Sequence, residues 1–138
     1  MRFEDGATSQ KIVLRMLDGS MKKCTIYAHF SCAFTKIKVV TLEGRVESVD
    51  LDKVKAIFFV KEFDGNPGYK AGTDFDEHSP RAGKVVRVTF PDGETIRGRV
   101  LNFARQRKGF FLYPADSRDN NEKVYVVRLP DTRIEVET

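Results

Sequence analysis

The sequence has no tryptophan, only two cysteines and two histidines, and no long uninterrupted apolar run. A transmembrane helix needs about 20 consecutive apolar residues, so the sequence contains no candidate for one. Residues 1–6 also lack the apolar stretch of a secretory signal peptide. Because so few cysteines without an export signal are typical of a reducing compartment, we expect a cytoplasmic protein.

Potential metal ligands are scarce. Cys24, His29 and Cys32 lie close together, but there is no Cys-x-x-Cys pair, and His78 lies far away in a Gly/Pro-rich segment. Structural zinc sites use four ligands, usually in closely spaced pairs. We therefore expect neither a metal nor a cofactor, and we interpret the thiols as small buried apolar groups.

The residue spacings typical of catalysis are also missing. The carboxylates are scattered, and no Ser, Cys or His lies in a spacing that suggests a nucleophile with its base. There is no Gly-rich phosphate-binding loop. We predict that the protein is not an enzyme.

Short apolar runs rich in β-branched and aromatic residues are abundant, and no window shows sustained helical periodicity. Such runs are typical of strands. Residues 12–19 and 86–93 are each a short apolar strand that ends in Asp-Gly, a strong hairpin signal. Further predicted strands follow in the same order in both segments: 23–30, 36–41, 49–51 and 55–60 in the first, and 95–103, 109–113, 127–129 and 133–136 in the second.

We interpret this shared order as an internal repeat, with a coincidence of strand-rich composition as the alternative. The predicted fold class is all-β, with two tandem five-stranded small barrels at residues 10–63 and 84–138. Barrel closure removes the exposed strand edges that invite aggregation. Gly98, inside a long second strand, fits a sharp bend or a bulge.

Residues 64–83 differ in composition from both segments. A cluster of Asp, Gly, Asn and Pro typical of turns is followed by a short acidic stretch. We predict a Gly/Pro-rich acidic linker here, held against a barrel by Tyr69 and Phe75.

The second segment resembles an Sm-type small barrel. The resemblance depends on a Val-x-Val-x-Phe strand, an Asp-Gly turn and a later Gly-x-Val, carried by Val86, Val88, Phe90, Asp92, Gly93, Gly98, Val100 and Phe103. It implies Sm-like or SH3-like topology. The opening Sm helix is absent, the third strand 109–113 is not Asn-rich, and Pro130-Asp131 stands where Sm proteins have Arg-Gly. Because these departures fall on the RNA-contacting positions of Sm proteins, the resemblance does not imply RNA binding.

A wider pattern is similar to an uncharacterised bacterial domain family. The shared residues are 55–61 (Lys-Ala-Ile-Phe-Phe-Val-Lys), Phe63, Gly65, 109–116 (Gly-Phe-Phe-Leu-Tyr-Pro-Ala-Asp) and Asn120-Asn121. Some members look like accessory domains of bacterial signalling proteins. The resemblance implies a module that binds a partner and says nothing about a reaction.

One basic segment is a candidate binding site. Its residues combine cations with aromatic rings: Arg97, Arg99, Arg105, Arg107, Lys108, Phe111 and Tyr113. In single-stranded nucleic-acid grooves, cations neutralise phosphates and rings stack on bases. The net charge of +4 is compatible with this role. The alternative is a solvated strand face followed by a charged loop.

The strands 57–60 and 110–113 are apolar on both faces, so both faces must be covered. The favoured interpretation is packing between the two segments, and the alternative is a partner-binding or dimer surface. We therefore expect a monomer or a weak homo-oligomer.

Residues 116–121 come nearest to the cyclic-dinucleotide motifs of PilZ domains but match neither of them, and they are also typical of a polar turn.

Taken together, these features favour a non-catalytic binding or regulatory module. Protein–protein interaction in bacterial signalling is the leading prediction, and binding of single-stranded RNA or DNA through residues 97–113 is the alternative. We expect no membrane partner.

Overall fold

The computed structural model describes residues 10–27, 35–65, 68–69, 72–79, 81–101 and 108–137. These residues form strands joined by turns, with one short 3-10 helix, η2 (Leu51–Lys53). The strands are β1 (Lys11–Met16), β2 (Met21–Ile26), β3 (Lys36–Thr41), β4 (Val46–Asp50), β5 (Val54–Val60), β6 (Lys84–Thr89), β7 (Thr95–Val100), β8 (Gly109–Pro114), β9 (Asn121–Val127) and β10 (Arg133–Val136). The predicted all-β fold is confirmed. No helix in the described part of the chain has the length and apolar character to span a membrane.

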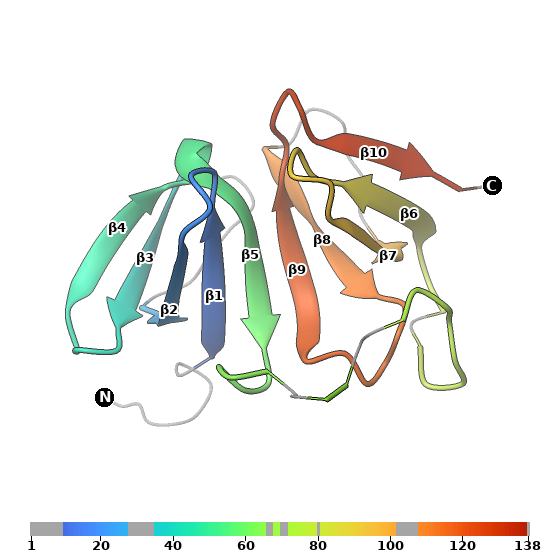
Figure 1. Cartoon of the computed structure of the whole chain (residues 1–138), viewed down its shortest axis with the longest axis horizontal. Helices are drawn as coiled ribbons and strands as arrows, with labels where there is room; N and C mark the ends of the chain where they lie inside the picture. Colours follow the sequence, from blue (N-terminus) through green and yellow to red (C-terminus); the bar gives the residue numbers. More distant parts are fainter. Residues whose placement is uncertain are drawn as a thin grey trace.

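All ten strands belong to one antiparallel sheet in the order β10-β6-β7-β8-β9-β5-β1-β2-β3-β4 (Figure 1). We call β1–β5 the first half and β6–β10 the second half. Both halves pair their strands in the same order, β5-β1-β2-β3-β4 and β10-β6-β7-β8-β9. The pairing of β5 with β9 joins them, and we call this pair the junction.

The prediction of two separately closed barrels is corrected by this topology. The sheet is single and open, with β4 and β10 at its two edges. Every residue of β5 is buried, and β9 is buried over its last four residues. β5 and the second part of β9 are apolar on both faces. Pairing them in the middle of one sheet removes more apolar surface from water than leaving each at the edge of a separate barrel.

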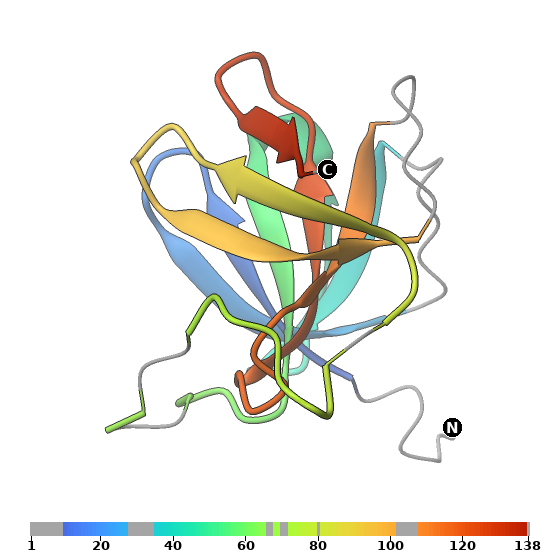
Figure 2. The same cartoon turned by 90° about the vertical axis from the view of Figure 1, so that its right-hand side faces the viewer.

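Each face of the junction belongs to a different hydrophobic core. On β5, Ile57 and Phe59 enter the core of the first half, whereas Ala56 and Phe58 enter the core of the second half. The sheet therefore curls around one core in its first half and around the other in its second. Figure 2 shows β6 and β7 crossing in front of β5 and β9.

Three aromatic residues of the strands predicted to be apolar on both faces are internal: Phe58 and Phe59 on β5, and Phe110 on β8. Phe58, Phe59 and Phe110 are each only 2% exposed. Burying one such ring contributes about 1.5–3 kcal/mol. The burial of these rings stabilises the contact between the halves.

The two predicted Asp-Gly hairpin turns are present, between β1 and β2 and between β6 and β7. Gly19 and Gly93 have φ angles of 92° and 94°, which side chains other than glycine rarely adopt. In each turn the aspartate Oδ1 accepts the backbone N–H two residues later, at 2.9 Å from Ser20 and 3.0 Å from Glu94. The same local chemistry closes both hairpins.

Some predicted strand limits were wrong. The short predicted strands 49–51 and 127–129 overlap only the ends of β4 and β9, which start earlier at Val46 and Asn121. Leu51 already begins η2, and residues 128–129 follow β9. The early parts of both strands contain polar residues, Glu47 and Ser48 in β4 and Asn121, Glu122 and Lys123 in β9, so alternation alone did not distinguish them from loops. Gly98 is not a bulge, because the β6–β7 register passes through it unshifted. A Cβ there would lie 2.1 Å from the carbonyl oxygen of Tyr113, so close approach of β8 requires glycine.

Candidate functional site

The outer face of the second half carries several of the predicted binding residues. Arg97 and Arg99 alternate along β7 with core-facing Gly98 and Val100, and Tyr113 on β8 lies directly opposite Arg99. Because opposite residues in a sheet share a face, Arg97, Arg99 and Tyr113 lie on one surface.

Of the remaining predicted residues, the two that the structure describes, Lys108 and Phe111, make contacts with the first half. Lys108 precedes β8 and forms an ion pair with Asp52 of η2 in the first half. Arg105 and Arg107 lie outside the described residues. Phe111 lies 5.2 Å from the Tyr125 ring and 5.7 Å from the Phe59 ring, measured between centroids, so it packs over the junction.

Residues 72–79, which we call the strap, cross the arginine-bearing face. The Phe75 ring lies 4.8 Å from the guanidinium carbon of Arg97 and 4.9 Å from that of Arg99. Arg97 donates to the backbone oxygen of Thr73 at 2.7 Å. It also donates two hydrogen bonds, at 2.8 and 3.0 Å, to the carboxylate of Glu137. These bonds and the nearby Asp74 carboxylate raise the pKa of Arg97.

Two aspartates anchor the strap and the residues before it. Buried Asp116 accepts hydrogen bonds from the Tyr69 hydroxyl and, at 2.9 Å, from the Gly72 N–H. Asp76 accepts from the Ser117 N–H at 3.1 Å and from its hydroxyl at 3.0 Å. These bonds, the Ser117 N–H first, lower the pKa of Asp76 to about 2. Tyr69 and Phe75 therefore hold the segment that contains them against the second half.

An ion cluster at the junction was not predicted from the sequence. Arg15 lies opposite Ala56 and Met16 opposite Val54, so Lys55 is the extra residue of a β-bulge. The bulge directs the nearly buried Lys55 side chain to the β6–β7 turn. Its Nζ lies 2.7 Å from both Asp92 Oδ2 and Glu94 Oε1. A lone lysine inside an otherwise apolar strand was the available signal.

The Lys55 ion pairs are reinforced by neighbouring contacts. The Lys55 Nζ lies 4.6 Å from the Phe90 ring centroid, within cation–π distance. Arg15 Nη1 adds an ion pair to Glu94 at 3.2 Å. The hydrogen bond from Lys55 lowers the pKa of Asp92. This cluster fixes the hairpin turn of the second half against the first.

A groove of about 220 Å³ lies between the halves. Its walls come from β1, β2 and β5 on one side and from the loops after β5 and before β9 on the other. The apolar lining residues are Val13, Met21, Phe58, Val60 and Phe63, and the polar ones include Arg15, Lys23, Asp64, Asn120 and Asn121.

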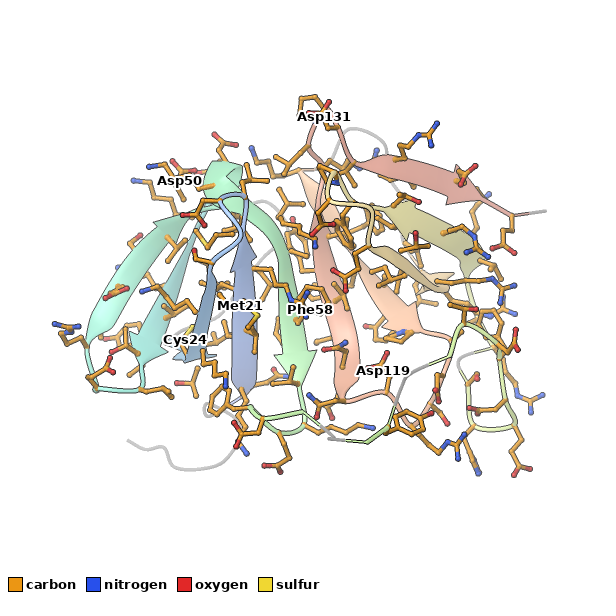
Figure 3. The ribbon with its side chains drawn as sticks, in the orientation of Figure 1. Met21, Cys24, Asp50, Phe58, Asp119 and Asp131 are labelled. Atoms are coloured by element: carbon orange, nitrogen blue, oxygen red, sulfur yellow. The ribbon has the colours of Figure 1, made fainter. Side chains whose placement is uncertain are left out.

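Met21 is the exposed apolar residue of the groove, with 57% of its surface accessible, and it lies beside Phe58 in Figure 3. A second hollow of about 180 Å³ adjoins the groove and shares Asn121 with it. Asp119 lines this hollow, and burial raises the pKa of its carboxyl.

Cys24 is fully buried in the core of the first half, as predicted, and burial raises the pKa of its thiol to about 11. His29 and Cys32 lie outside the described residues. Among the described residues, no three or more His, Cys, Asp or Glu side chains are grouped so that they could hold a metal.

Comparison with known proteins gives one match. Residues 8–137 match a family of unknown function, DUF6982. Neither a curated protein nor a solved structure matches the chain. The match extends over nearly the whole sequence and confirms the predicted similarity to an uncharacterised domain family. The chain belongs to the family of unknown function DUF6982.

Proposed function

We propose that the protein is a non-catalytic binding module that holds a segment of a partner protein in the groove between its halves. A role in bacterial signalling is part of this proposal and is supported by the sequence resemblance alone. The shared strand order of the halves supports, in addition, an origin by duplication of a five-stranded Sm-like or SH3-like unit.

The observation that carries the proposal is the composition of the groove. Its lining combines buried Phe58 with exposed Met21, a flexible side chain that adapts to different partners. A volume of about 220 Å³ is below the ~300–1,000 Å³ of typical small-molecule sites, which favours individual side chains of a peptide.

Charged side chains at the groove can exchange their ion-pair partners with little loss of free energy. Lys23 and Asp64 form an ion pair at 3.4 Å, and the Asp64 side chain is 93% exposed. Exposed ion pairs contribute only about 0–1 kcal/mol, so a partner carboxylate or ammonium group can replace one member. An apolar floor with exchangeable charges at its edge suits a segment with both apolar and charged side chains.

Nucleic-acid binding through residues 97–113 remains the alternative proposal, with less support. Arg97 already donates to Glu137 and Thr73, and Lys108 is paired with Asp52. A nucleic acid would have to break these contacts before its phosphates were neutralised. Its affinity would fall steeply with salt concentration, which distinguishes the two proposals.

The test uses a phage-displayed library of random dodecapeptides and methyl-labelled methionine in the full chain. Selected peptides should shift the Met21 methyl resonance. Met21→Asp should weaken their binding at least about tenfold, a loss of about 1.4 kcal/mol. The matched control is Leu17→Asp, at an exposed apolar residue outside the groove lining, which should leave affinity unchanged.

Three outcomes would contradict the proposal. The library could select no binder, or Leu17→Asp could weaken binding as much as Met21→Asp. Single-stranded oligonucleotides could bind more tightly than any selected peptide, with a steep salt dependence. The last result would favour the alternative.

A further inference from the structure

The strap lies on the arginine-bearing face with few buried contacts. Within residues 72–79, only Ser79 is buried, Phe75 is half-buried and the other residues are exposed. Segments held by few buried apolar contacts open locally at low free-energy cost. The strap is therefore the kind of element that can leave the sheet while both cores remain intact.

The strap and the face beneath it are complementary in charge. Arg87 lies opposite Arg97 in the β6–β7 register, so Arg87, Arg97 and Arg99 share the face, with Glu135 and Glu137 as the nearby carboxylates of β10 and its end. The strap carries three acidic residues next to Phe75 in sequence, Asp74, Asp76 and Glu77. It places an aromatic ring against two guanidinium groups and carries carboxylates at the flanking sequence positions 74, 76 and 77.

We propose that this face is a docking surface for an acidic peptide segment with an aromatic residue, and that the strap occupies it as an internal ligand. A partner segment must then displace the strap to bind. The proposal concerns a surface separate from the groove, so each proposal can fail without the other.

Tethering explains how eight residues can hold the surface. A short tether keeps a segment at an effective concentration of about millimolar, so an external peptide of equal affinity competes poorly. Each cation–π contact of Phe75 is individually weak. Weakening one contact of the strap should therefore measurably increase the binding of an external peptide.

The experiment measures binding of a fluorescein-labelled strap peptide, Gly-Thr-Asp-Phe-Asp-Glu-His-Ser, by fluorescence anisotropy. Phe75→Ala removes the ring, and Asp76→Asn weakens the second anchor without touching the ring. Each variant of the full chain should bind the peptide at least about tenfold more tightly than the wild type. Thermal unfolding confirms that each variant is folded.

Three controls link the binding to this face. A peptide with alanine in place of phenylalanine should not bind. Adding Arg99→Gln to Phe75→Ala should abolish the gain, whereas adding Leu42→Asp should leave it unchanged, because exposed Leu42 lies in the turn between β3 and β4 of the first half.

The proposal is overturned if neither opening variant gains affinity, or if the gain survives Arg99→Gln. It is also overturned if an eight-nucleotide oligothymidine binds the opened variants more tightly than the peptide, because the face would then be a nucleic-acid surface.

Discussion

The ammonium group of Lys55 lies 2.7 Å from the Asp92 carboxylate, although the residues belong to different halves and are 37 positions apart. Lys55 reaches this position because a bulge in β5 turns it toward the β6–β7 turn. The hairpin that opens the second half therefore has a charged anchor in the first half.

We expect Lys55→Ala to lower the free energy of unfolding by about 1–3 kcal/mol, because Asp92 and Glu94 lose their shared partner at a nearly buried site. Urea unfolding measures the change. The control is Lys22→Ala, which removes a more exposed pair with Glu47 and should cost under about 1 kcal/mol. Equal losses in the two variants would contradict an anchoring role for Lys55.

Gly98→Ala should be more destabilising than Gly93→Ala. The new Cβ at position 98 would meet the Tyr113 backbone oxygen at 2.1 Å, so β7 and β8 must separate. At Gly93 nothing lies within 4 Å, and the cost is the left-handed backbone alone, about 1–2 kcal/mol. Chemical denaturation of both variants ranks them, and the reverse order would show that the strands adjust easily.

Acidification should release the strap before it unfolds the cores. The pKa of Asp76 in the folded protein is about 2, below its ordinary value of 3.8. Its hydrogen bonds to Ser117 are therefore fully stabilising above pH 3.8 and are lost as the pH falls through about 2. The Ser117 amide resonance should report this titration. In Asp76→Asn the titration should disappear, and its persistence would assign it to another group.

The Cys24 thiol should resist modification in the folded protein. Its pKa of about 11 leaves almost no thiolate at pH 8, and the core excludes reagents. In a Cys32→Ser variant, a disulfide reagent should react at pH 8 only after denaturant is added. Because the folded pKa exceeds the ordinary value of 9.0, the stability contributed by the neutral thiol is lost as pH rises from about 9 to about 11. Rapid native modification would show that the first half opens readily.

Neither half should fold stably alone. The core of the first half includes Tyr125 and Val127 from β9, so a fragment of residues 1–63 loses part of its apolar filling. Circular dichroism of fragments 1–63 and 64–138 should show little strand signal separately and a native-like spectrum after mixing. Folded single fragments would instead support two independent barrels.

The turns and strands could be predicted from the sequence, because they depend on residues that are close together in the chain. The pairs Asp18-Gly19 and Asp92-Gly93 predicted both hairpins, and the absence of helical periodicity predicted the all-β class. The apolar residues 57–60 predicted that both faces of that strand are covered, whereas in 110–113 Phe111 and Tyr113 are only half-buried. Strand alternation also predicted that Arg97 and Arg99 share a face, whereas the position of Tyr113 on that face depends on the β7–β8 pairing.

What covers each face was decided only by the tertiary structure. The β5–β9 pairing joins residues such as Phe58 and Val124, which are far apart in sequence, and depends on the apolar surface that both strands bury together. The bulge at Lys55 and the placement of Phe75 against two arginines depend on distant partners in the same way. Alternation in the sequence predicts which side chains of a strand share a surface. Which segment packs against that surface depends on the free energy of the whole folded chain.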